Sequence, residues 1–135
     1  MSYCVGISTK YGLAFMSDTR TNAGLDDLSQ FKKLFTWGRS DDRLFTLLSA
    51  GNLATTQAVV SEIDQDFKSK KSQLHRCKSM FEVAEFVGQQ LHNKVKKHSE
   101  NEINAESTFK ASLILGVRLK DQNLLFFLYT RREIL

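Results

Sequence analysis

Two helix-like patterns in the middle of the chain, with strand-like segments on both sides, constrain the fold most. Asn52 is a suitable N-cap for the first helix, and Ser79 with Glu82 three residues later is a capping-box pattern that begins the second. The apolar residues of each helix fall on one face: Leu53, Val59, Val60, Ile63 and Phe67 in the first, and Met80, Ala84, Val87, Leu91 and Val95 in the second. We therefore expect the two helices to cover one face of a sheet.

Six segments rich in β-branched, aromatic and aliphatic residues predict strands. They are residues 3–8, 13–17, 32–37, 43–49, 109–119 and 123–130. Residues 18–30 are predicted as a polar turn region and residues 68–78 as a solvated loop. The order of four strands, two helices and two strands predicts an α+β fold, and the length suits one domain, residues 1–135.

The apolar run at residues 124–129 (LLFFLY) predicts a strand that is buried on both faces. The chain ends six residues after this run. Without a following element, such a strand is an exposed edge that favours aggregation. We therefore expect either a partner that covers this strand or a domain that is incomplete.

Composition and charge exclude several classes of function. The net charge of +4 is mostly local to the basic run at 68–78, which no aromatic residue interrupts, so we predict no nucleic-acid partner. No apolar stretch approaches the roughly 20 residues that span a bilayer, and the start of the chain lacks the pattern of a secretory signal. Cys4 and Cys77 suit a reducing cytoplasm. Neither they nor the histidines have metal-ligand spacing, and phosphate-loop and dinucleotide motifs are absent, so we predict no metal and no organic cofactor.

Ser2 is the first candidate for catalytic chemistry. If Met1 is removed, Ser2 carries both a hydroxyl and a free α-amine. An α-amine has an ordinary pKa of roughly 7.7–8.0 and can accept the hydroxyl proton near neutral pH. A serine at this position is common, so by itself it indicates only an ordinary trimmed N-terminus.

Four motifs in the first 57 residues bear on the role of Ser2. They are SYCVG at 2–6, SDTRTNAG at 17–24, FKK at 31–33 and LLSAGNLATTQ at 47–57. With them the chain resembles the proteasome β-type N-terminal-nucleophile hydrolases, most closely the bacterial Anbu, or ancestral β-subunit, family. The resemblance extends to about residue 130. It implies an αββα sandwich in which the first residue of the first strand is the catalytic nucleophile.

The resemblance also implies the catalytic residues. Ser2 takes the place of the nucleophile, Lys33 that of the catalytic lysine, and Asp18 that of the aspartate that orients the lysine. Gly51 takes the place of the glycine whose backbone N–H stabilises the oxyanion. A Lys33 ammonium near Ser2 would favour the ionised hydroxyl and the neutral amine. Gly51 directly precedes a helix N-terminus, where the dipole favours negative charge.

Three more roles follow from the same resemblance. Asn22 falls where the backbone pairs with an extended substrate, and Arg20 is a structural arginine of the motif. Ser49 matches a position that helps to shape the primary specificity pocket. Because Ser49 is small and neutral, we expect no preference for a charged residue there.

The sequence departs from the family in two respects. Ser2 replaces the usual threonine and lacks the methyl group that restricts χ1, so we expect a slower enzyme. Family members also continue well beyond residue 135. We therefore expect a C-terminally truncated, incomplete sandwich, without its second helical layer and later strands.

These features predict a cytoplasmic peptidase subunit of the proteasome type. It would hydrolyse peptide bonds in peptides or unfolded proteins by acyl transfer from Ser2, within a ring-shaped or helical homo-oligomer. One alternative is a catalytically inactive truncated homologue or interaction subunit. Another is an N-terminal-nucleophile amidase that acts on a small amide.

Overall fold

The computed structural model describes residues 2–22, 28–39, 41–99, 110–120 and 125–130. The strands are β1 (Cys4–Thr9), β2 (Gly12–Ser17), β3 (Arg20–Asn22), β4 (Leu28–Gln30), β5 (Leu34–Gly38), β6 (Arg43–Gly51), β7 (Ala111–Leu119) and β8 (Leu125–Thr130). The helices are α1 (Leu53–Lys68), α2 (Gln73–Arg76) and α3 (Met80–Ser99). Both predicted helices and all six predicted strands are present, which confirms the α+β class.

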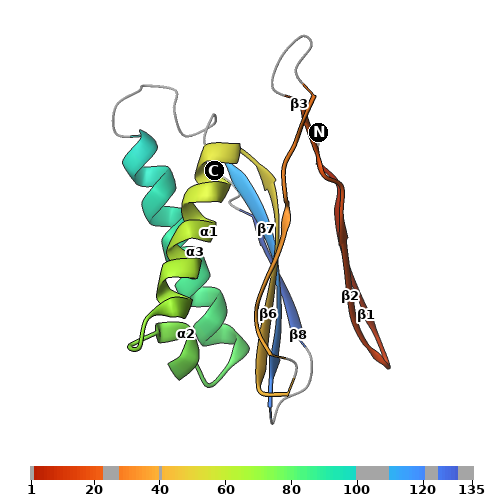
Figure 1. Cartoon of the computed structure of the whole chain (residues 1–135), viewed down its shortest axis with the longest axis vertical. Helices are drawn as coiled ribbons and strands as arrows, with labels where there is room; N and C mark the ends of the chain where they lie inside the picture. The colour runs from red at the N-terminus through yellow and green to blue at the C-terminus, as the bar shows by residue number, and fades with distance from the viewer. Residues whose placement is uncertain (1, 23–27, 40, 100–109, 121–124, 131–135) are drawn as a thin grey trace, which may run out of the picture.

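The elements form three layers (Figure 1). The middle layer is the antiparallel sheet β5-β6-β7-β8, in which β8 pairs with β7. Helices α1 and α3 lie on one face of this sheet, and the antiparallel β1–β2 hairpin lies on the other. The predicted pair of helices on one sheet face is thus confirmed, and the incompleteness of the sandwich stays a prediction.

The hydrophobic core lies between the helices and the sheet. Alternate residues of β6 and β7 supply the sheet side of this core: Phe45, Leu47, Leu113, Leu115 and Val117. The predicted stripe of α1 contributes Val59 and Ile63. In α3 the core also contains Val83 and Phe86, while Ala84 is only half-buried, so this helix has a wider apolar face than predicted.

Side-chain caps mark the start of both long helices, as predicted. Asn52 Oδ1 accepts a hydrogen bond from the Thr55 N–H at 3.0 Å. Ser79 Oγ accepts from the Glu82 N–H at 3.3 Å, and the Glu82 carboxylate accepts from the Lys78 N–H at 2.8 Å. These caps satisfy backbone N–H groups that have no partner inside a helix. None of the described helices is both long and apolar enough to cross a membrane.

The single tryptophan of the chain links the sheet to the helices. Trp37 of β5 donates from Nε1 to Asp64 Oδ1 of α1 at 3.0 Å and packs against the core. The Lys68 ammonium binds the other Asp64 oxygen at 2.6 Å. The hydrogen bond from Lys68, followed by that from Trp37, lowers the pKa of Asp64, which keeps this carboxylate ionised as an acceptor.

Two segments predicted as irregular contain secondary structure. Residues 18–30 include the short antiparallel pair β3–β4. The prediction of a solvated loop over 68–78 is wrong in part, because α2 lies within it and buries Leu74. The Asp66 carboxylate accepts hydrogen bonds from Ser72 Oγ and from the N–H groups of Gln73 and Leu74, at 2.8 to 3.1 Å. Burial raises the pKa of Asp66, but these hydrogen bonds outweigh it and hold that pKa below its usual value.

The two faces of the β1–β2 hairpin differ. On the face toward the sheet, Phe15 lies over Gly116 of β7, where an added Cβ would stand 2.2 Å from the Phe15 Cζ atom. Only a residue without a side chain permits this close approach. The other face carries apolar side chains that are 41% to 68% exposed, namely Tyr3, Val5, Ile7 and Met16.

Candidate active site

A part-buried ion pair joins two of the predicted catalytic residues. Asp18 follows β2 and Lys33 precedes β5. The Lys33 ammonium donates to Asp18 Oδ2 at 2.8 Å and to Oδ1 at 3.0 Å, and it also donates to the Arg20 carbonyl. Only 6% of the Lys33 side chain is exposed, so these acceptors replace the water that an ammonium group otherwise binds.

Asp18 also holds the beginning of the described chain. Its Oδ1 accepts a hydrogen bond from the Tyr3 N–H at 2.8 Å, and the Asp18 N–H donates to the Tyr3 carbonyl at 3.0 Å. The hydrogen bond from Lys33, and after it the one from Tyr3, lowers the pKa of Asp18, so the carboxylate is ionised at neutral pH. Tyr3 directly follows Ser2, so the predicted nucleophile is next in sequence to a residue that binds Asp18.

Ser49, near the end of β6, contacts Lys33 and the first residue of β1. The Ser49 N–H donates to the Lys33 carbonyl at 2.9 Å, and the Cys4 thiol donates to the Ser49 carbonyl at 3.5 Å. Burial and the negative charge of Asp18 raise the pKa of Cys4 against the opposing effect of Lys33, so the thiol is neutral at neutral pH. Ser49 itself is buried, and its role in specificity stays a prediction.

Gly51 ends β6 immediately before the N-cap of α1. Its φ angle is +106°, and an added Cβ would stand 2.5 Å from the Lys110 carbonyl oxygen. Both the backbone conformation and the available space therefore require glycine. The position next to a helix N-terminus, where the dipole is positive, is compatible with the predicted oxyanion role, which no contact in the structure tests.

The short strand β3 contains the other two predicted residues. Arg20 pairs with Gln30 and Asn22 with Leu28. The contact between Arg20 and the ion pair is made by its carbonyl oxygen, which accepts from Lys33. The substrate-pairing role of Asn22 and the structural role of Arg20 stay predictions.

Sequence reasoning missed three groups at this site: the Tyr3 N–H, the Arg20 carbonyl and the Cys4 thiol. The first two belong to the backbone, so no residue type could have revealed them. Alternation along β1 could have placed Cys4 on the inward face with Gly6. Within the described residues, no cluster of three or more His, Cys, Asp or Glu side chains is arranged to hold a metal ion.

The chain was compared with known proteins by sequence and by structure. No protein-family model and no curated protein matches it. Solved structures do match over 96% of the chain. Anbu (ancestral beta-subunit) from Yersinia bercovieri is 34% identical with a TM-score of 0.83, and an Anbu mutant from Hyphomicrobium sp. strain MC1 is 35% identical with a TM-score of 0.82. The chain is Anbu-like.

A further Anbu structure agrees with this assignment. It is a helical assembly of the Anbu complex from Pseudomonas aeruginosa, 26% identical over 96% of the chain, with a TM-score of 0.76. The Anbu-like chain spans about half the length of these relatives, between 52% and 57%. The resemblance that the motifs indicated is therefore confirmed over nearly the whole of this chain.

Proposed function

We propose that the Anbu-like chain is a proteasome-type peptidase subunit in which Ser2, freed by removal of Met1, is the nucleophile. The observation that carries this proposal is the ion pair between the buried Lys33 and Asp18, whose carboxylate also binds the backbone of Tyr3. Asp18 thus binds both Lys33 and the residue that follows Ser2, and in this proposal the Lys33 ammonium near Ser2 favours negative charge on the attacking oxygen and a neutral amine beside it.

The proposed reaction proceeds through an acyl-enzyme. The α-amine of Ser2 takes the hydroxyl proton while Oγ forms a bond to the carbonyl carbon of the peptide. The N–H of Gly51 and the N-terminus of α1 stabilise the resulting oxyanion. The carbon–nitrogen bond then breaks, the amine gives its proton to the leaving nitrogen, and an ester on Ser2 remains. Water attacks this ester with the same amine as base, which releases the acid and restores Ser2.

The substrates in this proposal are peptides and unfolded proteins, and the subunit assembles into a ring-shaped or helical homo-oligomer. The helical assembly of the Pseudomonas aeruginosa Anbu complex supports the proposed homo-oligomer. We place the subunit in the cytoplasm, because Cys4 and Cys77 are both free thiols, which suits a reducing compartment.

The test combines the intact mass of the purified protein with the hydrolysis of short fluorogenic peptide amides. We expect a mass without Met1 and a measurable turnover that Ser2→Ala lowers about 1000-fold. Alanine also permits removal of Met1, so this variant keeps the free amine and loses only the hydroxyl.

Ser8→Ala is the matched control, since Ser8 is an exposed serine on β1, the strand that follows Ser2. It should retain wild-type turnover. Retention of Met1, or equal turnover by wild type and Ser2→Ala, would overturn the proposal. The alternative would then be an inactive homologue or an interaction subunit.

A further inference from the structure

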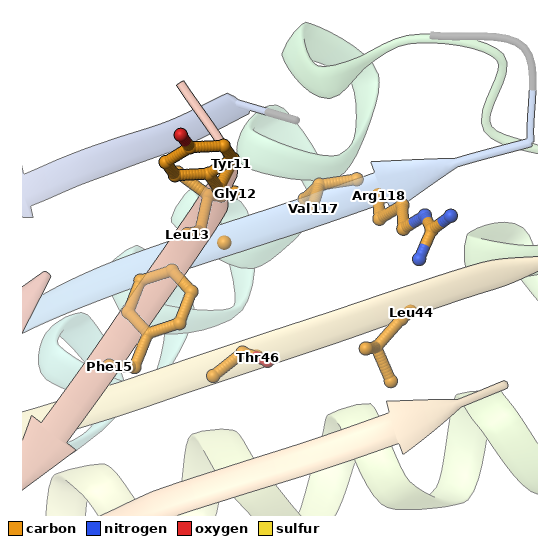
Figure 2. Close-up of a pocket in the computed structure, with 9 residues that line it drawn as sticks. Tyr11, Gly12, Leu13, Phe15, Leu44, Thr46, Val117 and Arg118 are labelled. Atoms are coloured by element: carbon orange, nitrogen blue, oxygen red, sulfur yellow. The ribbon is translucent and has the colours of Figure 1, made fainter. Parts of the chain in front are cut away.

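A pocket of about 280 Å³ lies between the turn end of the β1–β2 hairpin and the four-stranded sheet. Figure 2 shows Tyr11, Leu13 and Phe15 of the hairpin on one side, and Leu44, Thr46 and Arg118 on β6 and β7. The hairpin strands are six residues long, so this end lies about 20 Å from Asp18. The pocket is therefore separate from the candidate active site.

The register of β6 and β7 explains why this space is open. Thr46 is opposite Gly116, and Leu44 is opposite Arg118, so these two pairs lie on the same face of the sheet, toward the hairpin. Phe15 covers the first pair because Gly116 has no side chain. The second pair lies beyond the Phe15 ring and lines the open part of the pocket (Figure 2).

The polar groups of the pocket favour an anion. Arg118 is the only charged lining residue, and none of the lining residues is acidic. Within the described part of the chain, the side chains of Arg118 and of the buried Thr46 have no hydrogen-bond or ion-pair partner. A guanidinium group binds a carboxylate through two parallel hydrogen bonds, which a neutral or cationic head group cannot accept in the same way.

We propose that this pocket binds a small carboxylate with an apolar tail. The carboxylate binds the Arg118 guanidinium at the rim, and the tail packs between Leu44 and the Phe15 ring. The volume lies near the lower limit of small-molecule pockets, which hold roughly 300–1,000 Å³, so the ligand is small. This binding is independent of Ser2 and of peptide hydrolysis.

The test is isothermal titration calorimetry of the full chain with octanoate, octan-1-ol and octylamine, which share one tail and differ in head group. We expect saturable octanoate binding, with affinity for octan-1-ol about tenfold lower and for octylamine lower still. Arg118→Gln should lower octanoate affinity about tenfold and leave octan-1-ol unchanged. Arg118→Lys should restore part of the loss, because it keeps the charge without the planar fork.

Lys97→Gln on α3 is the matched control, because it removes one positive charge from an exposed site in the helix layer. It should bind octanoate like wild type, and circular dichroism checks that each variant is folded. The proposal is overturned if octanoate does not saturate, if the three probes bind equally, or if folded Arg118→Gln binds octanoate like wild type.

Discussion

The Asp18 carboxylate binds the ammonium group of Lys33 and the N–H of Tyr3. Residue types alone indicate at most a surface pair of Asp18 and Lys33, and their catalytic pairing is predicted from the family resemblance. The structure contains this pair. The bond to Tyr3 could not be predicted, because a backbone N–H leaves no trace in the sequence. The catalytic roles of Ser2, Lys33 and Gly51 stay predictions until turnover is measured.

The Asp18–Lys33 pair predicts a pH-dependent contribution to stability. The folded-state pKa of Asp18 is lowered, so the pair stabilises the fold above the unfolded pKa of about 3.9 and this contribution is lost as the pH falls through the folded value. We expect Asp18→Asn to have a lower urea midpoint than wild type at pH 7. The difference should shrink below about pH 4, where wild type also loses the charge.

Asp41→Asn is the control for this measurement. Asp41 pairs with Arg39 at 2.9 Å, but both side chains are largely exposed, so its removal should change the midpoint little at either pH. If Asp18→Asn lowers the urea midpoint by the same amount at pH 7 and at pH 3, the predicted dependence of stability on the Asp18 charge is contradicted.

At the scale of elements, local signals were sufficient for the long helices and for the β1–β2 hairpin. The caps at Asn52 and Ser79 and the apolar stripes depend only on residues within the same element. The short elements could not be found in this way. β3 consists of three polar residues, and α2 depends on hydrogen bonds to Asp66, which lies in the preceding helix.

The close contact between Phe15 and Gly116 predicts that packing of the hairpin on the sheet contributes to the stability of the fold. Gly116→Ala places a methyl group where the Phe15 ring lies, so the ring or the hairpin must move. We expect the free energy of unfolding to fall by about 1–3 kcal/mol in urea denaturation. Combining Gly116→Ala with Phe15→Leu should recover part of this loss. Equal stability of Gly116→Ala and wild type contradicts the close packing of these two residues.

At the scale of the whole molecule, the central sheet depends on a pairing between distant segments. β6 and β7 pair over nine residues, although α1, α2 and α3 lie between them in the chain. Apolar composition predicted each strand, but it contains no information on which strand pairs with which, or in what register. The arrangement of the layers was easier to predict, because two helices that are each apolar on one face must cover a sheet face.

The outward face of the β1–β2 hairpin predicts binding of a hydrophobic dye to the native protein. Combining Ile7→Thr with Met16→Thr should lower the fluorescence of bound anilinonaphthalene sulfonate by about half, since both side chains are more than 50% exposed. The free energy of unfolding should change by less than about 0.5 kcal/mol, because threonine suits exposed strand positions.

Phe81→Ser is the control for the dye measurement. Phe81 is 78% exposed on α3, and its removal leaves the hairpin unchanged. Most of the dye signal should remain in this variant. Unchanged emission in the hairpin double variant contradicts the assignment of the dye to this face.

The bond between Trp37 and Asp64 gives the molecule a built-in optical reporter. Trp37 is the only indole in the chain, and it sits where the sheet meets the helices. The emission wavelength of Trp37 and its quenching by iodide should therefore change when α1 separates from β5, so no added fluorescent label is needed. The hairpin carries Tyr3 and Tyr11 instead, which are excited at shorter wavelengths. The third tyrosine, Tyr129, lies in β8, so the two signals should be compared in a Tyr129→Phe variant. Their order during unfolding would then reveal whether the helix layer or the hairpin leaves the sheet first.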